Sequence, residues 1–314
     1  MAFKILISDK IEPVCPARFK AAGFEADEKS GLSPAELSAL VGQYDGLVIR
    51  SATKVTAEVL EKGAAGKLRI VGRAGAGLDN VDQEAAGRLG VKVVNTPGLN
   101  ANAVAELTIA LMVVLSRKLW PAMESIKAGR WEKKGLSGYE IGGKTLGLVG
   151  LGAVGKLVAA KARGMGMKVL AHDPILPAGA VQAAGADPVG FDDLFKLSDY
   201  VSLHLPKTKE TTNIVNAAVL ATMKPTAYLL NCARGGLVDE GALYQALKDK
   251  RLAGAATDVF VKEPPDPSPL MELPNFVAIP HLGASTEEAQ LAVAEKVADL
   301  LIEFLGGQPG TGAS

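Results

Sequence analysis

Three polar residues in the C-terminal third of the chain each follow an expected β-strand, and their types suit proton and hydride exchange at an α-keto acid. They are Arg234, Glu263 and His281. A guanidinium binds a carboxylate bidentately and polarises the neighbouring carbonyl, while an imidazole exchanges a proton near neutral pH. A protonated imidazole is favoured by a carboxylate partner, and we expect Glu263 in that role. If Glu263 is only a surface charge, Asp258 is the next carboxylate to consider.

A glycine-rich run follows another expected strand and matches the GxGxxG pattern of dinucleotide-binding loops. The run reads Gly150-Leu151-Gly152-Ala153-Val154-Gly155, and the segment after it is typical of a helix. The glycines allow a tight turn and bring a pyrophosphate close to the N–H groups at the helix start. The next strand ends in Asp173, near the roughly 20-residue spacing of ribose-binding acids. No arginine is adjacent to bind a 2′-phosphate, so the pattern favours NAD over NADP; the alternative is a packing turn beside a solvated carboxylate.

The remaining histidines, His172 and His204, lie at the ends of expected strands of the same region. Each either has a structural role or lines the adenine pocket. Two cysteines, Cys15 and Cys232, lie far apart and form no CxxC pair. This usage is typical of a reducing compartment, and we expect a cytoplasmic protein with no bound metal.

Composition excludes several classes of protein. Of 314 residues, 48% are hydrophobic and 22% are charged, which is ordinary for a globular chain. Lysine plus arginine equals aspartate plus glutamate at 34 each, so there is no basic excess for nucleic-acid binding. The uncharged stretches are far shorter than the roughly 20 residues of a membrane span. We therefore expect neither a nucleic acid nor a membrane as partner.

Strands and helices alternate in two series, which favours two parallel α/β sheets covered on both faces. The expected strands are 3–8, 46–49, 68–71, 91–94, 144–149, 168–171, 200–205, 227–231, 254–259 and 276–279. Between the two series we expect one long helix, Ala103 to Lys127. A last helix, Ser285 to Leu305, is expected before a frayed tail from Gly306 to Ser314.

The motifs together resemble one enzyme family. They are Gly150–Gly155 with Asp173, Asn231–Gly236, Asp258–Phe260 with Glu263–Pro265, Pro280–Thr286, Val48–Val55 and Gly72–Asp82. The chain resembles the D-isomer-specific 2-hydroxyacid dehydrogenases over about residues 3–308, and within them the branch that oxidises D-3-phosphoglycerate in serine synthesis. The resemblance implies an NAD-dependent enzyme with a small 2-hydroxy or 2-keto acid as substrate.

The resemblance also implies the architecture. A Rossmann NAD-binding domain at 98–283 is expected to be inserted into a flavodoxin-like substrate-binding domain made of 1–97 and 284–314. The helix near Ala103 is expected to pair subunits into a homodimer or a dimer of dimers.

Roles for further residues come from the same resemblance. Arg50 and Arg73 would bind the substrate phosphate. The substrate carboxylate would bind the backbone N–H groups of Ala74, Gly75, Ala76 and Gly77. Ala233, Asp258 and Gly283 would touch the nicotinamide end of the cofactor, and Pro206 its adenine side. Cys232 and His204 complete the expected cofactor-binding residues. Lys133 replaces an arginine of animal relatives, so a phosphate contact made to a partner chain would be weaker or absent.

Two other functions remain compatible with these residues. One is a related dehydrogenase that reduces glyoxylate, hydroxypyruvate or another small 2-keto acid, for which the Arg50 and Arg73 pair would be unnecessary. The other is an NAD-sensing binding protein like the co-repressors that share this fold, which needs a surface for a partner protein. Such sensors can retain Arg234, Glu263 and His281.

Overall fold

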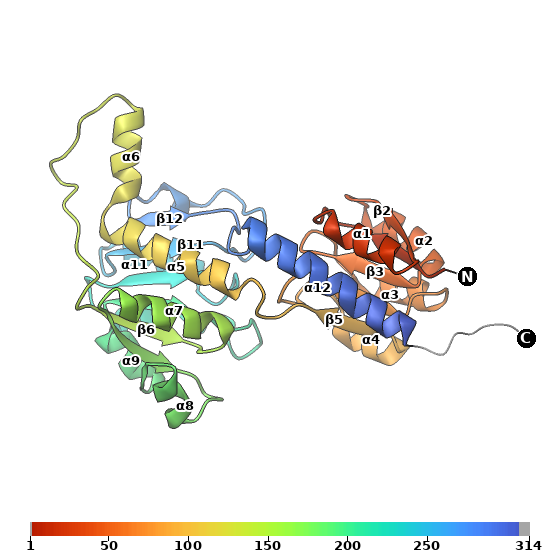
Figure 1. Ribbon diagram of the computed structural model, residues 1–314. Coiled ribbons are helices and arrows are strands. Elements are labelled where there is room, and N and C mark those ends of the chain that lie inside the picture. Colours follow the sequence, from red (N-terminus) through yellow and green to blue (C-terminus); the bar gives the residue numbers. More distant parts are fainter. Residues whose placement is uncertain (1, 308–314) are drawn as a thin grey trace, which may run out of the picture. The chain divides into compact units, whose positions relative to one another are not determined.

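The chain folds into two compact units, and the computed structural model describes residues 2–307 of it. The first unit is formed by the residues up to Asn100 together with those from Ala284 onward, and the second by Ala101–Gly283. The second unit is therefore an insertion in the sequence of the first (Figure 1). Most of the expected tail, residues 308–314, lies outside the described residues.

The first unit contains a parallel sheet of five strands. Its strands are β1 (Lys4–Ile7), β2 (Glu25–Glu28), β3 (Gly46–Ile49), β4 (Ile70–Arg73) and β5 (Lys92–Asn95). They lie in the order β2-β1-β3-β4-β5, and all pairs are parallel. This is the flavodoxin-like order that the sequence predicts, with ligands expected beyond the carboxyl ends of the strands.

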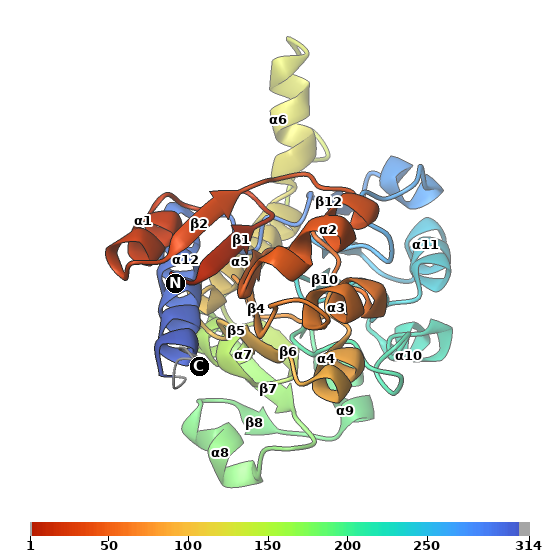
Figure 2. The same cartoon turned by 90° about the vertical axis from the view of Figure 1, so that its right-hand side faces the viewer.

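Helices cover both faces of that sheet (Figure 2). Alternate residues point to opposite faces, so Ile5 packs with α1 (Val14–Ala21) and α12 (Glu287–Gly306), while Leu6 packs with the other helices. Those are α2 (Pro34–Leu40), α3 (Ala57–Ala64) and α4 (Gln83–Leu89). Gly306, expected to begin the tail, is the last residue of α12.

The second unit contains a parallel sheet of seven strands. They are β6 (Thr145–Val149), β7 (Lys168–His172), β8 (Asp187–Pro188), β9 (Tyr200–Leu203), β10 (Tyr228–Asn231), β11 (Gly254–Thr257) and β12 (Phe276–Ala278). Their order is β12-β11-β10-β9-β6-β7-β8, with every pair parallel. The glycine-rich run follows β6, at the point where the strand order reverses. The predicted Rossmann arrangement is thereby confirmed.

Two layers of helices enclose this second sheet. On one face lie α5 (Ala101–Ser116), α7 (Ala153–Gly164) and α8 (Ala178–Ala183), and on the other α9 (Phe191–Leu197), α10 (Ala217–Thr222) and α11 (Glu240–Lys248). Helices α5 and α7 pack side by side, as Figure 1 shows. No helix among residues 2–307 is both long and apolar enough to cross a membrane.

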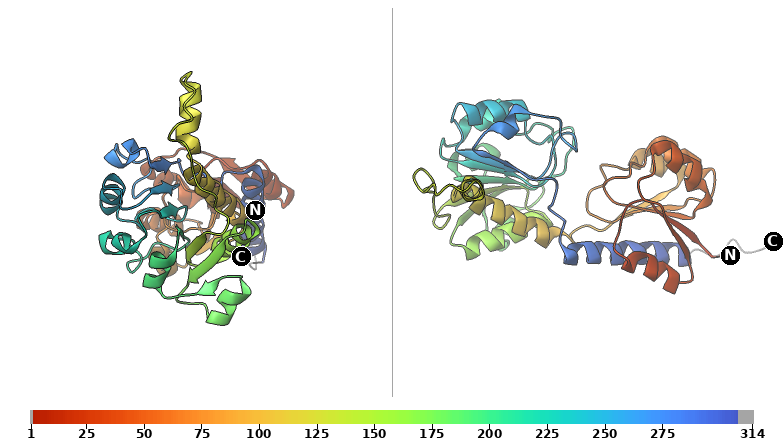
Figure 3. Two further views of the ribbon diagram at one scale, coloured as in Figure 1. Left: turned by 90° about the vertical axis from the view of Figure 1, so that its left-hand side faces the viewer. Right: turned by 90° about the horizontal axis from the view of Figure 1, so that it is seen from above.

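The prediction of a single long helix from Ala103 to Lys127 is wrong. The segment forms two helices, α5 and α6 (Leu119–Lys127), separated by Arg117 and Lys118. Pro121 has no N–H to donate to the carbonyl of Arg117, and Lys118 turns the chain with a φ of 51°. Helix α6 consequently projects away from the rest of its unit (Figure 3).

Candidate active site

The glycine-rich loop after β6 has the shape that a dinucleotide requires. A Cβ on Gly150, whose φ is +94°, would lie 2.5 Å from the His204 carbonyl oxygen. A Cβ on Gly155 would lie 2.4 Å from the Gly150 carbonyl oxygen, so helix α7 packs directly on the turn. Beside Gly152, at the start of α7, a Cβ would meet no described atom within 4 Å. The loop therefore fits a pyrophosphate at the helix N-terminus.

Asp173 connects this loop to the end of β7. Its Oδ2 accepts from the Leu151 N–H at 2.8 Å, and its Oδ1 accepts from Ile175 and Leu176 at 3.0 and 3.2 Å. Burial alone would raise the pKa of Asp173, but these three N–H donors outweigh it and hold the pKa below its usual value. Asp173 is thus a charged group at the expected ribose position, and it also shapes the glycine loop.

The two histidines near this loop make local structural contacts. His204 Nε2 lies 2.9 Å from Ser202 Oγ, and desolvation lowers the pKa of its imidazole to about 4. His172 Nδ1 lies 3.2 Å from the Val189 carbonyl oxygen, and its ring makes a T-shaped contact with the Phe191 ring. His204 is therefore neutral at physiological pH. Pro206 follows it on the exposed loop after β9.

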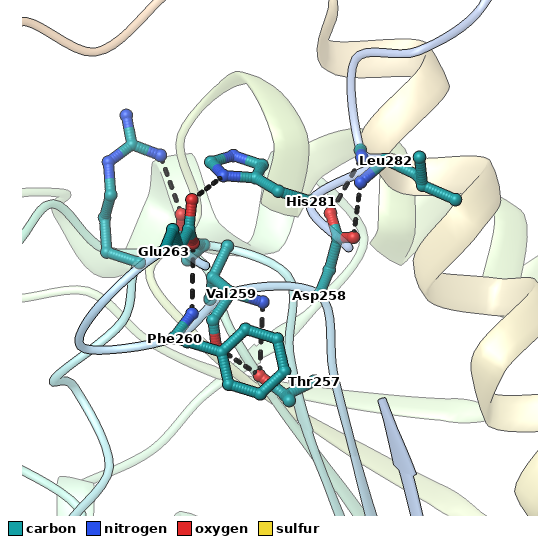
Figure 4. Close-up of polar contacts among 10 residues, drawn as sticks. Thr257, Asp258, Val259, Phe260, Glu263, His281 and Leu282 are labelled. Atoms are coloured by element: carbon teal, nitrogen blue, oxygen red, sulfur yellow. Dashed lines mark hydrogen bonds and ion pairs between the residues drawn. The ribbon is translucent and has the colours of Figure 1, made fainter. Parts of the chain in front are cut away.

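Glu263 and His281 form a close pair on neighbouring loops. His281 Nδ1 lies 2.6 Å from Glu263 Oε2, and both side chains are half-exposed (Figure 4). The other carboxylate oxygen, Oε1, accepts from the Phe260 N–H at 3.1 Å. A hydrogen on Nδ1 shared with the carboxylate leaves Nε2 as the nitrogen that can exchange a proton with a substrate. The pairing carboxylate is thus Glu263 and not Asp258.

Asp258 instead holds the backbone that follows His281. It is buried, and its two oxygens accept from the Leu282 and Gly283 N–H groups at 2.6 and 2.7 Å (Figure 4). Burial raises the pKa of Asp258, and these two N–H donors act in the opposite direction. His281 itself has a φ of 52°, in the left-handed region that only glycine adopts readily. Asp258 therefore fixes the conformation in which His281 is presented.

Arg234 lies on the loop after β10, beside the loop that carries Glu263. The Asn231 side chain shapes the Arg234 loop, since Nδ2 donates to the Arg234 carbonyl and Oδ1 accepts from the Ala233 N–H. A Cβ on Gly235 would lie 1.8 Å from the Phe260 carbonyl oxygen, so the two loops are in backbone contact. The carboxyl ends of β10, β11 and β12 thus bring the three expected residues to one edge of the sheet. Buried Cys232 lies directly before this loop.

The first unit has its own cluster at the carboxyl ends of β3 and β4. Arg73 ends β4 opposite Ile49, and Arg50 follows Ile49. A Cβ on Gly75 would lie 2.4 Å from Arg73 Nη1, so the guanidinium passes over the 74–77 loop. The N–H groups of Ala74 and Gly75 already donate within the unit, to the Ile49 carbonyl and to Thr96 Oγ1. Two of the four N–H groups expected to bind the substrate carboxylate, those of Ala74 and Gly75, are therefore already used within the unit.

Lys133 lies in the segment after α6, in the second unit, with its side chain exposed. Several large apolar side chains of this region are also exposed: Leu119, Trp120, Met123, Ile126 and Trp131, the last at 86%. Such a set of apolar residues on a projecting helix and the segment after it is typical of a protein–protein contact. Among the described residues, no group of three or more potential ligands could hold a metal ion.

Comparison with known proteins agrees with this geometry. The chain is 46% identical over 310 residues to D-3-phosphoglycerate dehydrogenase of Synechocystis sp. and 44% identical over 309 residues to that of Rattus norvegicus. These matches cover 99% and 98% of this chain but 55% and 58% of the relatives. The chain thus spans about half the length of the curated relatives it matches.

Solved structures share the whole architecture. The TT0316 protein from Thermus thermophilus is 34% identical with a TM-score of 0.88, covering 98% of this chain and 99% of that one. A glyoxylate reductase from Paecilomyes thermophila is 29% identical with a TM-score of 0.88, covering 98% and 96%. Residues 109–283, more than half of the chain, match the family described as D-isomer specific 2-hydroxyacid dehydrogenase, NAD binding domain. The chain belongs to the D-isomer-specific 2-hydroxyacid dehydrogenase family.

Proposed function

We propose that this protein oxidises D-3-phosphoglycerate to 3-phosphohydroxypyruvate, with NAD as the hydride acceptor. The observation that carries the proposal is the 2.6 Å contact between His281 Nδ1 and Glu263 Oε2. This pair lies at the same edge of the sheet as Arg234. The same unit carries the dinucleotide loop, and the other unit carries two arginines at neighbouring strand ends. The names of the relatives from Synechocystis sp. and Rattus norvegicus support the choice of substrate.

His281 carries the proton. In the oxidative direction its Nε2 accepts the proton of the substrate hydroxyl as the hydride leaves the carbon that bears this hydroxyl. The Glu263 carboxylate, bound to Nδ1, stabilises the imidazolium that results. In the reductive direction the imidazolium returns the proton to the developing alkoxide. Asp258 keeps the His281 loop in place through both steps.

Arg234 binds the substrate carboxylate and polarises the carbonyl of the keto acid. NAD, when bound at the loop after β6, supplies the acceptor for the hydride. Within the first unit, the N–H groups of Ala76 and Gly77 are the part of the 74–77 loop that we propose for the carboxylate. Arg50 and Arg73 bind the phosphate, and Lys133 adds a weaker phosphate contact.

Asp173 is expected to set the cofactor preference. Its ionised carboxylate would face the 2′-phosphate of NADP as a like charge, so NAD should be preferred in kcat/KM. Asp173→Asn should narrow this preference by roughly 10-fold or more, the scale of one charge-assisted hydrogen bond. Steady-state kinetics with both cofactors check this result. Equal kcat/KM values in the unmodified protein would contradict it.

The two arginines are expected to recognise the phosphate. Arg50→Ala and Arg73→Ala should each raise KM for the phosphorylated acid by roughly 10- to 100-fold, since each removes a charge-assisted contact of about 1.5–3 kcal/mol. An unphosphorylated analogue should be much less affected. If both substrates lose activity equally, the arginines have a structural role only.

We also propose that the protein is a homodimer that forms through the projecting helix α6. The exposed apolar side chains of α6 are the support for this contact. The double substitution Met123→Glu and Ile126→Glu should convert the dimer to a monomer, because burying two carboxylates in an apolar contact is costly. Light scattering after size exclusion measures this. A monomeric unmodified protein at micromolar concentration would refute the contact.

The function itself is tested by NADH formation from D-3-phosphoglycerate, with the keto product trapped by hydrazine. Parallel assays follow NADH oxidation with 3-phosphohydroxypyruvate, hydroxypyruvate and glyoxylate, so that kcat/KM is compared in one direction. The proposal expects the phosphorylated acid to have the highest kcat/KM. Preference for glyoxylate or hydroxypyruvate would indicate the related dehydrogenase instead, and NADH binding without turnover would indicate a sensor.

Cys15 and Cys232 are both free and buried, which supports the reducing cytoplasm as the proposed location.

A further inference from the structure

A short segment at the carboxyl end of β3, from Arg50 to Thr53, is held by a buried carboxylate. Asp9 follows β1 and is only 7% exposed. Its Oδ2 accepts from the Arg50 N–H at 2.6 Å and from the Thr53 N–H at 3.2 Å. Its Oδ1 accepts from the Thr53 hydroxyl at 2.8 Å. A buried carboxylate is costly unless hydrogen bonds satisfy it, and here three donors do so.

Asn80 holds the same segment by its carbonyl groups. The Asn80 Nδ2 donates to the Arg50 carbonyl at 2.7 Å and to the Thr53 carbonyl at 2.6 Å. Thus the N–H and the C=O of both Arg50 and Thr53 are bonded to side chains from other parts of the first unit. The Ser8 hydroxyl adds a further contact, 3.0 Å from Thr53 Oγ1.

These contacts act on the residue that begins the loop beyond β3. The strand ladder ends at Ile49, so the position of Arg50 is set by Asp9 and Asn80 rather than by the sheet. The Arg50 side chain is anchored only weakly, with its Nη1 3.4 Å from the Lys10 carbonyl oxygen. A long side chain with little support needs a fixed backbone if its guanidinium is to meet a phosphate with the right geometry.

We infer that Asp9 and Asn80 are positioning residues for phosphate recognition, because together they fix the backbone from which Arg50 extends. This inference rests on the proposed function, in which Arg50 binds the substrate phosphate. Neither side chain is expected to touch the substrate. Their loss should weaken the binding of phosphorylated substrates much more than that of unphosphorylated ones.

The experiment compares two keto acids that differ by the phosphate group, 3-phosphohydroxypyruvate and hydroxypyruvate, in NADH oxidation by the full chain. The variants are Asp9→Ala, Asp9→Asn and Asn80→Ala. The Asn side chain at position 9 can accept from both N–H groups and donate to the Thr53 hydroxyl. That hydroxyl can then donate to the Ser8 carbonyl oxygen, which lies 3.4 Å from Thr53 Oγ1. Asp9→Asn should therefore restore much of what Asp9→Ala loses.

Asp45→Ala is the matched control. Asp45 is also buried, directly precedes β3 and accepts from the Lys4 N–H at 2.9 Å, at the opposite end of the same two strands. The Asp45→Ala substitution therefore removes a similar carboxylate-to-backbone contact of the same sheet without affecting the Arg50 segment. Thermal unfolding of all variants measures how much stability each one loses.

Asp9→Ala should raise KM for 3-phosphohydroxypyruvate by roughly 10- to 100-fold, the range for a misplaced binding group. The KM for hydroxypyruvate and all KM values of Asp45→Ala should change by no more than about twofold. If Asp9→Ala does not fold, Asn80→Ala gives the same comparison. Unchanged selectivity in both folded variants, or an equal loss for the two substrates, would overturn the inference. Failure of the proposed function is distinct, since the unmodified protein would then show no preference for the phosphorylated acid.

Discussion

His281→Ala is expected to lower kcat by about 10²- to 10⁴-fold, the usual cost of removing a general acid–base group. Among residues 2–307, the hydroxyl proton has no acceptor at this edge of the sheet that a carboxylate holds in place, other than His281. The Glu263 carboxylate contacts Nδ1 of His281 and does not lie where Nε2 of that imidazole would meet the substrate. Glu263 therefore does not replace the imidazole directly. The loss should therefore appear in kcat for both oxidation and reduction.

Binding of the cofactor distinguishes this effect from misfolding. The dinucleotide loop follows β6, whereas His281 follows β12 and its side chain is half-exposed. NADH binding to His281→Ala, measured by fluorescence, should stay near that of the unmodified protein. A variant that keeps kcat within a few-fold would show that another group moves the proton. A variant that no longer binds NADH would show that His281 supports the fold of the cofactor site.

Asp258→Asn is expected to lower kcat by roughly 10- to 100-fold, because small displacements of a reacting group have effects of this size. The amide oxygen can still accept one of the two N–H groups of Leu282 and Gly283. The amide NH₂ then faces the other N–H, and two donors cannot bond to each other. The left-handed conformation of His281 loses its support, and the imidazole moves away from Glu263.

The pH dependence of unfolding checks the electrostatic part of this account. Burial raises the pKa of Asp258 in the folded state, so the folded protein binds a proton more readily there than the unfolded chain. The stability that this group contributes is then present at low pH and falls as the pH rises through the raised pKa. The free energy of unfolding, measured in urea at about pH 4 and pH 7, contains this contribution in the unmodified protein and should lack it in Asp258→Asn. An Asp258→Asn protein with unchanged kcat would refute the positioning role.

The sequence predicts most of this fold because its strongest signals are local. Apolar strands such as Gly46–Ile49 lie where their sequence pattern predicts them. Helix starts carry local signals too, since Ser33 and Glu36 form a capping box at the start of α2. The edge strand β2 was missed because its residues, Glu25–Glu28, are mostly charged and exposed and lack any apolar pattern. The break at Lys118 was missed because the flanking segments are both apolar, and the single proline at position 121 was the only signal.

Within the site, residue types and order identified Arg234, Glu263 and His281, because strand ends in a parallel sheet meet at one edge. The tertiary hydrogen bonds could not be predicted in the same way. Asp258 reaches across 24 residues to the Leu282 N–H, and Asp9 reaches across 41 to the Arg50 N–H. Nothing in the local sequence distinguishes such a carboxylate from one that faces solvent. Only the buried position of each side chain reveals that it holds a loop.

Deuterium transfer tests the central claim most directly. D-3-phosphoglycerate labelled with deuterium at carbon 2 is incubated with NAD and the protein, and the reduced cofactor is analysed by mass spectrometry. Hydride transfer from that carbon predicts reduced cofactor carrying one deuterium, with no such product from His281→Ala on the same timescale. Reduced cofactor without deuterium, or no reduction by the unmodified protein, would contradict the proposed reaction.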